Sequence, residues 1–87
     1  MAELVLPAIL VALFPGTPRR LAVDGATVGE VLAELDRRTP GMGDRLLTVG
    51  PSLREHIKVF VDREPSDLAT PVGPGSVVHV ITAVSGG

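Results

Sequence analysis

The chain has 87 residues, a net charge of −2 and no cysteine. This length is typical of one domain, over residues 1–87, whose core is too small to enclose a large active site. The nearly balanced charge does not indicate binding to nucleic acid or to an anionic membrane surface. The absence of cysteine excludes a disulfide framework, a thiolate metal site and a cysteine nucleophile.

Residues 3–6 are predicted to form the first strand. Pro7 limits how far this strand can pair, because proline has no backbone N–H to donate to a neighbouring strand. The apolar residues 8–13 either extend this strand past a bulge or fold over one edge of the core as an irregular segment. The stretch 4–14 is not a signal peptide, since Glu3 stands where a basic residue is expected, and it is too short to span a membrane. We therefore expect a core strand followed by a partly buried loop, in a cytoplasmic protein.

A turn at residues 15–18 sends residues 19–23 back as a second strand, antiparallel to the first. Thr27 and Glu30 then have the spacing of a capping box, which predicts that a helix begins there. Its apolar residues recur at helical spacing and form one stripe that should cover one face of the sheet. The helix should stop at Pro40-Gly41, with its charged side facing solvent.

Residues 42–55 are the least regular part, with one short helical turn expected at 44–47. Residues 57–61 alternate as a half-buried strand that ends in a turn at 62–65, and the run from Val77 is the last strand. The predicted fold is α+β, with the order β-β-α-β-β, a mixed sheet and one main helix across one face.

Strand parity divides the last two strands between two faces. Ile57, Val59, Val61, Val78 and Val80 should face the helix. Phe60, His79 and Ile81 should then lie together on the uncovered face, as a surface on which a partner docks. The alternative is that the long connection or residues 8–13 fold over this face.

The sequence ends in a tail, residues 83–87, whose last members are Val84, Ser85, Gly86 and Gly87. Two glycines have no Cβ and great backbone freedom, so a flexible end of this kind can enter an enzyme channel too narrow for any side chain. The Gly87 carboxylate would then lie where the partner acts on it. The alternative is an ordinary frayed terminus.

Self-contained chemistry is nearly absent from the sequence. Neither a GxGxxG nor a GxxxxGK[ST] motif is present to hold a nucleotide phosphate. His56 and His79 lack a second ligand at metal-binding spacing, and no nucleophile-elbow motif occurs. We therefore expect a protein that is not an enzyme and that binds neither a metal nor a cofactor.

These features together resemble the ubiquitin-like β-grasp sulfur carriers of the MoaD/ThiS family, over essentially the whole length. The matching pieces are the di-glycine end Gly86-Gly87, the turn Gly73-Pro74-Gly75-Ser76, the helix opening at 27–32 and the strand at 59–62. The start at residues 6–10 and the long connection before the third strand are more similar to the CysO-like branch. Ser85 departs from the alanine or threonine that is usual there.

The resemblance implies that an E1-like enzyme of the MoeB, ThiF or MoeZ type uses ATP and Mg²⁺ to adenylate Gly87. Sulfur then displaces AMP and leaves a C-terminal thiocarboxylate, which donates its sulfur to a biosynthetic enzyme. Phe60, His79 and Ile81 would be the recognition surface of a carrier that is monomeric when alone. Cysteine, molybdopterin, thiazole and thiolated secondary metabolites all remain possible products.

Two other classes remain open. A ubiquitin-like modifier would join Gly87 to lysines of other proteins, whereas self-chains are disfavoured because Lys58 is the sole lysine. A non-catalytic β-grasp interaction domain would use the open face and ignore the tail.

Overall fold

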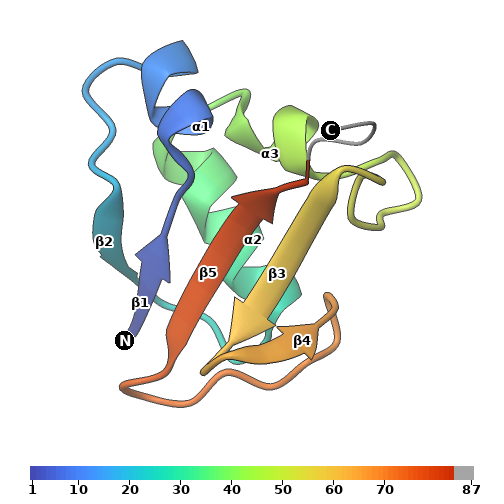
Figure 1. The fold of residues 1–87 in the computed structure, drawn as a ribbon. Helices are drawn as coiled ribbons and strands as arrows, with labels where there is room; N and C mark the ends of the chain where they lie inside the picture. The colour runs from blue at the N-terminus through green and yellow to red at the C-terminus, as the bar shows by residue number, and fades with distance from the viewer. Residues whose placement is uncertain (84–87) are drawn as a thin grey trace.

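The computed structural model describes residues 1–83, in which five strands and three helices follow one another (Figure 1). The predicted tail residues Val84, Ser85, Gly86 and Gly87 lie outside the described residues. The elements are β1 (Ala2–Val5), α1 (Ala8–Leu13), β2 (Arg20–Val23), α2 (Val28–Arg38), α3 (Met42–Leu46), β3 (Ile57–Val61), β4 (Glu64–Ser66) and β5 (Val77–Thr82).

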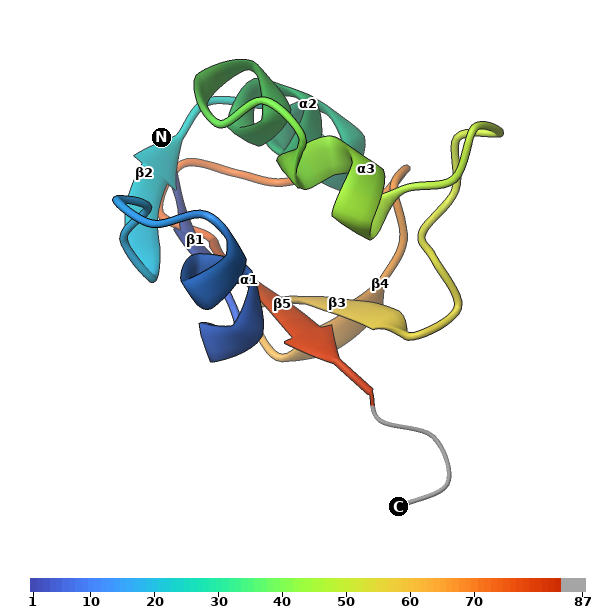
Figure 2. The ribbon, with the colours of Figure 1, turned by 90° about the horizontal axis from the view of Figure 1, so that it is seen from above.

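The strands form one mixed sheet in the order β2-β1-β5-β3-β4. β5 lies in the middle, parallel to β1 and antiparallel to β3, while β1–β2 and β3–β4 pair antiparallel. α2 lies on one face of the sheet (Figure 2), and with α3 it links β2 to β3 across the two strands β1 and β5 that separate them. The predicted mixed sheet with one main helix across one face is therefore confirmed.

The core lies between that face and the helices, and it is almost wholly aliphatic, as the composition indicates. α2 contributes one buried stripe, Val28, Val31, Leu32 and Leu35. β3 and β5 contribute alternate residues, Ile57, Val59, Val61, Val78 and Val80. The alternate residues of the strands and the apolar stripe of α2 thus pack against each other in one layer. This agrees with the prediction of which strand residues face the helix.

The start of α2 is fixed by the predicted capping box. The Glu30 N–H donates to Thr27 Oγ1 at 3.2 Å, and Glu30 Oε1 accepts from the Ala26 N–H at 3.1 Å. At the other end of α2, Arg37 and Arg38 both donate to Glu34 and lower its pKa to about 2. This ion cluster lies on the solvent side of α2, away from the core.

α1 is the first correction, because residues 8–13 form neither an extended strand nor an irregular segment. The Pro7 carbonyl accepts from the N–H groups of Leu10 and Val11, at 3.1 and 3.3 Å, and so opens a helix. Only Leu10 of this helix is buried, while Ile9 and Leu13 stay exposed. In residues 1–83 none of the helices combines the length and the apolar character that crossing a membrane requires.

α3 and β4 are the other differences. The expected turn at 44–47 is a helix that begins two residues earlier, at Met42, with Gly41 before it at a φ of 99°. The expected turn at 62–65 is a two-residue hairpin loop, Asp62-Arg63, followed by a short edge strand. Pro65 is tolerated in that strand because an edge strand need not donate on its outer side.

Candidate functional site

The uncovered face of the sheet carries the three predicted docking residues. His79 lies opposite Phe60 in the β3–β5 ladder, and Ile81 lies opposite Lys58. Phe60 and His79 are half-buried, and 44% of Ile81 is exposed. The structure therefore brings Phe60, His79 and Ile81 together on one face, as parity predicted.

Phe60 and His79 belong to a row that runs across the sheet. Val5 of β1 lies opposite His79, and Pro65 of β4 lies opposite Phe60 on its other side. The row therefore extends the predicted surface on both sides along one register. Neither expected cover occupies this face: α1 follows the end of β1, and α2 and α3 lie on the opposite side of the sheet (Figure 2).

The tail begins at the carboxyl end of β5. The last ladder contact there is the Ala83 N–H donating to the His56 carbonyl at 2.7 Å. β1 is parallel to β5 and ends at the same edge, where α1 follows, and β3 begins there beside His56. Ala83, the last described residue, therefore lies at the edge of the sheet where β1 ends and β3 begins (Figure 1).

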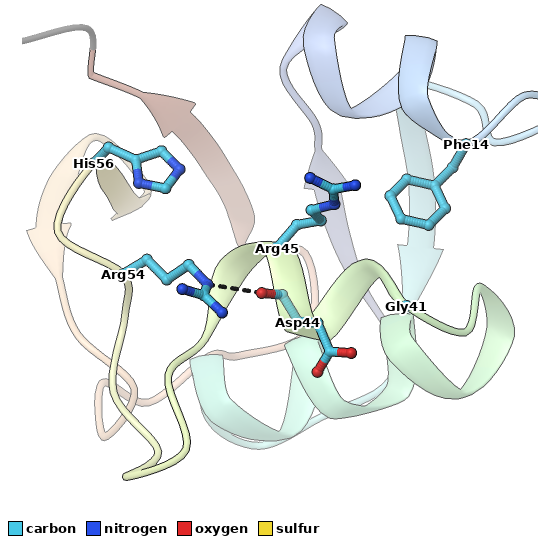
Figure 3. A pocket seen from close by; sticks show the side chains of 6 residues that line it. All are labelled: Phe14, Gly41, Asp44, Arg45, Arg54 and His56. Carbon is cyan, nitrogen blue, oxygen red and sulfur yellow. Dashed lines mark hydrogen bonds between the residues drawn. The ribbon is translucent and has the colours of Figure 1, made fainter.

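A cleft of about 670 Å³ opens at this edge, beside His56 (Figure 3). Its lining residues are Phe14, Gly41, Asp44, Arg45, Arg54 and His56. The Phe14 ring lies against Gly41, where a Cβ would come within 3.3 Å of it, so glycine permits this close approach. Arg54 is anchored by its Nε, which donates to the Asp44 carbonyl at 2.7 Å.

The cleft was not predicted from the sequence, because three segments that lie far apart in the chain supply its walls. One signal could have indicated part of it. His56 immediately precedes β3, which is antiparallel to β5, so simple register counting places it opposite the residue where the tail begins. No comparable pattern marks Arg45 or Phe14.

The described residues contain no group of three or more His, Cys, Asp or Glu side chains arranged to hold a metal ion. His56 and His79 lie at different places, the first at the cleft and the second within the row on the open face.

Comparison with known families decides the classification. The model of the ThiS family matches residues 12–87, which is most of the chain and includes the di-glycine. The chain belongs to the ThiS family. The resemblance to MoaD/ThiS carriers inferred from the sequence is thereby confirmed, whereas no curated protein sequence matches this ThiS-family protein significantly.

Solved structures agree with this assignment. The structure from the BexX/CysO complex of Amycolatopsis orientalis is 27% identical, with a TM-score of 0.89 and full coverage of both chains. CysO of Mycobacterium tuberculosis is 25% identical over 97% of this chain and 100% of its own, with a TM-score of 0.85. These matches confirm the β-grasp fold and the likeness to CysO.

An archaeal protein is similar as well. SAMP1 of Haloferax volcanii is 31% identical over 99% of this ThiS-family chain and 98% of its own, with a TM-score of 0.79. Another structure names it as small archaeal modifier protein 1. The ThiS-family protein is thus similar both to CysO and to a protein named as a modifier.

Proposed function

We propose that this ThiS-family protein is a sulfur carrier and that Gly87 bears the carboxylate on which the sulfur is loaded. The family match through Gly87 is the observation that carries the proposal. The position of Ala83 adds support, because the tail residues follow directly after the last ladder contact of the central strand. The chain acts as a co-substrate, and its partners perform the catalysis.

The chemistry needs an activated carboxyl group, because an oxide ion is a poor leaving group. In the proposed first step a Gly87 carboxylate oxygen attacks the α-phosphorus of ATP on an E1-like enzyme, and pyrophosphate leaves. A sulfide sulfur then attacks the acyl carbon, the bond to AMP breaks, and a thiocarboxylate remains. If the donor is a persulfide, the same attack gives an acyl disulfide, and a second thiol of the partner must break its S–S bond, becoming a disulfide itself, to release the thiocarboxylate. ATP and Mg²⁺ belong to the partner's reaction, and the absence of cysteine in the carrier removes an internal thiol that would compete for the activated carbonyl.

The open face is the proposed docking surface for the activating enzyme. An Ile81→Asp variant should slow activation about tenfold in kcat/KM, because a charge replaces an apolar side chain at the centre of the contact. Phe60→Asp should act in the same direction. Steady-state ATP–pyrophosphate exchange, with thermal unfolding as the control for folding, measures both variants. An unchanged rate for both would refute this docking face.

The second candidate is a protein modifier, which the similarity to the archaeal modifier protein favours. It would use the same adenylate, but a lysine amine of a target would displace AMP and form an isopeptide bond. A third reading, a binding-only domain, differs from both because deletion of Gly87 would leave its function intact.

One reaction separates the first two candidates. The purified chain is incubated with an E1-like enzyme, ATP, Mg²⁺ and sulfide in the presence of other proteins, and intact masses are then recorded. A carrier gains the mass difference between sulfur and oxygen on its own chain. A modifier instead appears joined to lysines of the other proteins, and that outcome without any sulfur-loaded chain would overturn the proposal.

A further inference from the structure

We infer that the cleft at the root of the tail, lined by Arg45, Arg54 and His56, receives an acidic side chain of the enzyme that takes up the tail. The inference rests on the proposed function, and it adds an electrostatic contact to the apolar docking face. The two surfaces are separate, since the cleft lies at the end of the sheet and the row Val5–His79–Phe60–Pro65 lies across its open face.

The charges in the cleft favour an acidic occupant. The Arg45 side chain makes no hydrogen bond or ion pair within residues 1–83, and the only hydrogen bond of the Arg54 side chain there is the one from its Nε to the Asp44 carbonyl. Figure 3 shows the Asp44 carboxylate pointing away from Arg45 and His56. Two guanidinium groups thus lack a carboxylate partner in the described part of the chain.

Three of the other five arginines have a carboxylate partner: Arg20 pairs with Glu3, and Arg37 and Arg38 both pair with Glu34. Arg19 and Arg63 have none within residues 1–83, so Arg45 and Arg54 are distinguished by lining the same cleft. The net charge of the whole chain is −2, so an unpaired cationic pair is not a consequence of overall composition. Arginine presents a planar fork that matches a carboxylate, which makes this pair suited to an Asp or Glu side chain.

This cleft is less suited to binding a small anion such as phosphate. Phosphate sites commonly use free backbone N–H groups at the start of a helix. At the start of α3 the N–H groups of Gly41 and Gly43 already donate to Asp36 Oδ1, at 3.2 and 2.8 Å. The cleft therefore offers side-chain cations without the backbone cradle, which favours a single carboxylate presented by a protein surface.

The place of the cleft explains why an activating enzyme would contact it. An enzyme channel that takes up residues 84–87 must open close to Ala83. The Ala83 N–H donates a hydrogen bond to the carbonyl of His56, which is one of the residues that line the cleft. The Arg45 guanidinium and the His56 ring approach the same space from opposite walls (Figure 3). An acidic residue on the rim of the channel would meet Arg45 as the tail enters.

An Arg45→Glu variant tests the inference in ATP–pyrophosphate exchange with the E1-like enzyme that adenylates the wild-type chain. We expect the KM for the carrier to rise about tenfold while kcat stays within about twofold, because the lost contact acts on docking. Higher salt should raise the wild-type KM and leave the variant nearly unaffected. Arg45→Lys should recover part of the loss, since it keeps the charge.

Arg63→Glu is the matched control, because Arg63 is an exposed arginine in the β3–β4 loop, at the opposite end of β3. It should leave KM unchanged. Equal KM values for wild type, Arg45→Glu and Arg63→Glu would overturn the inference while the proposed function stands. A wild-type chain that no E1-like enzyme adenylates would overturn the proposed function and the inference with it.

A titration with inorganic phosphate tests whether the cleft binds a small anion instead of a protein carboxylate. Saturable shifts of the Arg45 and His56 amide resonances below about 1 mM phosphate would assign the cleft to a small anion and overturn the inference. We expect only weak, non-saturating shifts.

Discussion

A Val80→Asp variant should fail to fold at 25 °C. Val80 lies on the central strand, is 3% exposed and faces Val59 in the ladder. An aspartate there would be buried among aliphatic side chains without a partner, at a cost of several kcal/mol, while small domains are stable by only about 5–15 kcal/mol. Far-UV circular dichroism and urea titration measure the loss.

The neighbouring residue provides the control for this prediction. Ile81 points to the opposite face and is 44% exposed, so Ile81→Asp should keep the native spectrum and stay within about 1 kcal/mol of the wild-type stability. A cooperatively folded Val80→Asp protein, or an unfolded Ile81→Asp protein, would show that the two faces of β5 are assigned wrongly.

Replacement of Gly86 and Gly87 by alanine should reduce activation at least about 100-fold, with no change in thermal stability. The proposed channel admits backbone alone, and each added methyl group must displace channel atoms or shift the acyl carbon from its reacting position. Both residues follow the last strand in the sequence, and glycine has no side chain, so their substitution removes no side-chain contact. ATP–pyrophosphate exchange and differential scanning calorimetry measure the two effects.

Gly73→Ala is a matched glycine-to-alanine control in the turn before β5. A Cβ at Gly73 would make an ordinary 3.7 Å contact with Ser76 Oγ, so the structure accommodates it. This variant should be activated at the wild-type rate. Normal sulfur transfer by the double-alanine tail would contradict the proposed role of the glycines, whatever the control does.

The sequence predicted those parts of the fold in which local and tertiary preferences agree. Thr27 and Glu30 marked the start of α2 because the capping box forms from residues close in sequence. The alternation in β3 and β5 identified the buried and open faces because a one-residue slip would exchange them. The position of Phe60, His79 and Ile81 on one face followed from the same argument, whereas their role in docking stays a prediction.

The remaining features depend on contacts that no short sequence pattern encodes. Residues 8–13 are apolar throughout, so their periodicity cannot distinguish a helix from a strand. β4 follows a loop in which Asp62 and Arg63 have φ values of 49° and 74°, without the glycine that usually indicates such a hairpin. The cationic cleft joins Phe14, which follows α1, with the start of α3 and the loop before β3, and only the tertiary structure brings these segments together.

The mass of the C-terminal peptide, isolated from cells that make the protein, tests most directly whether the Gly87 carboxylate carries sulfur. We expect a peptide that stops at Gly87, in which part of the population contains sulfur in place of one oxygen and loses it when the activating enzyme is deleted. A peptide that continues past Gly87, or one that never contains the extra sulfur, would contradict the account.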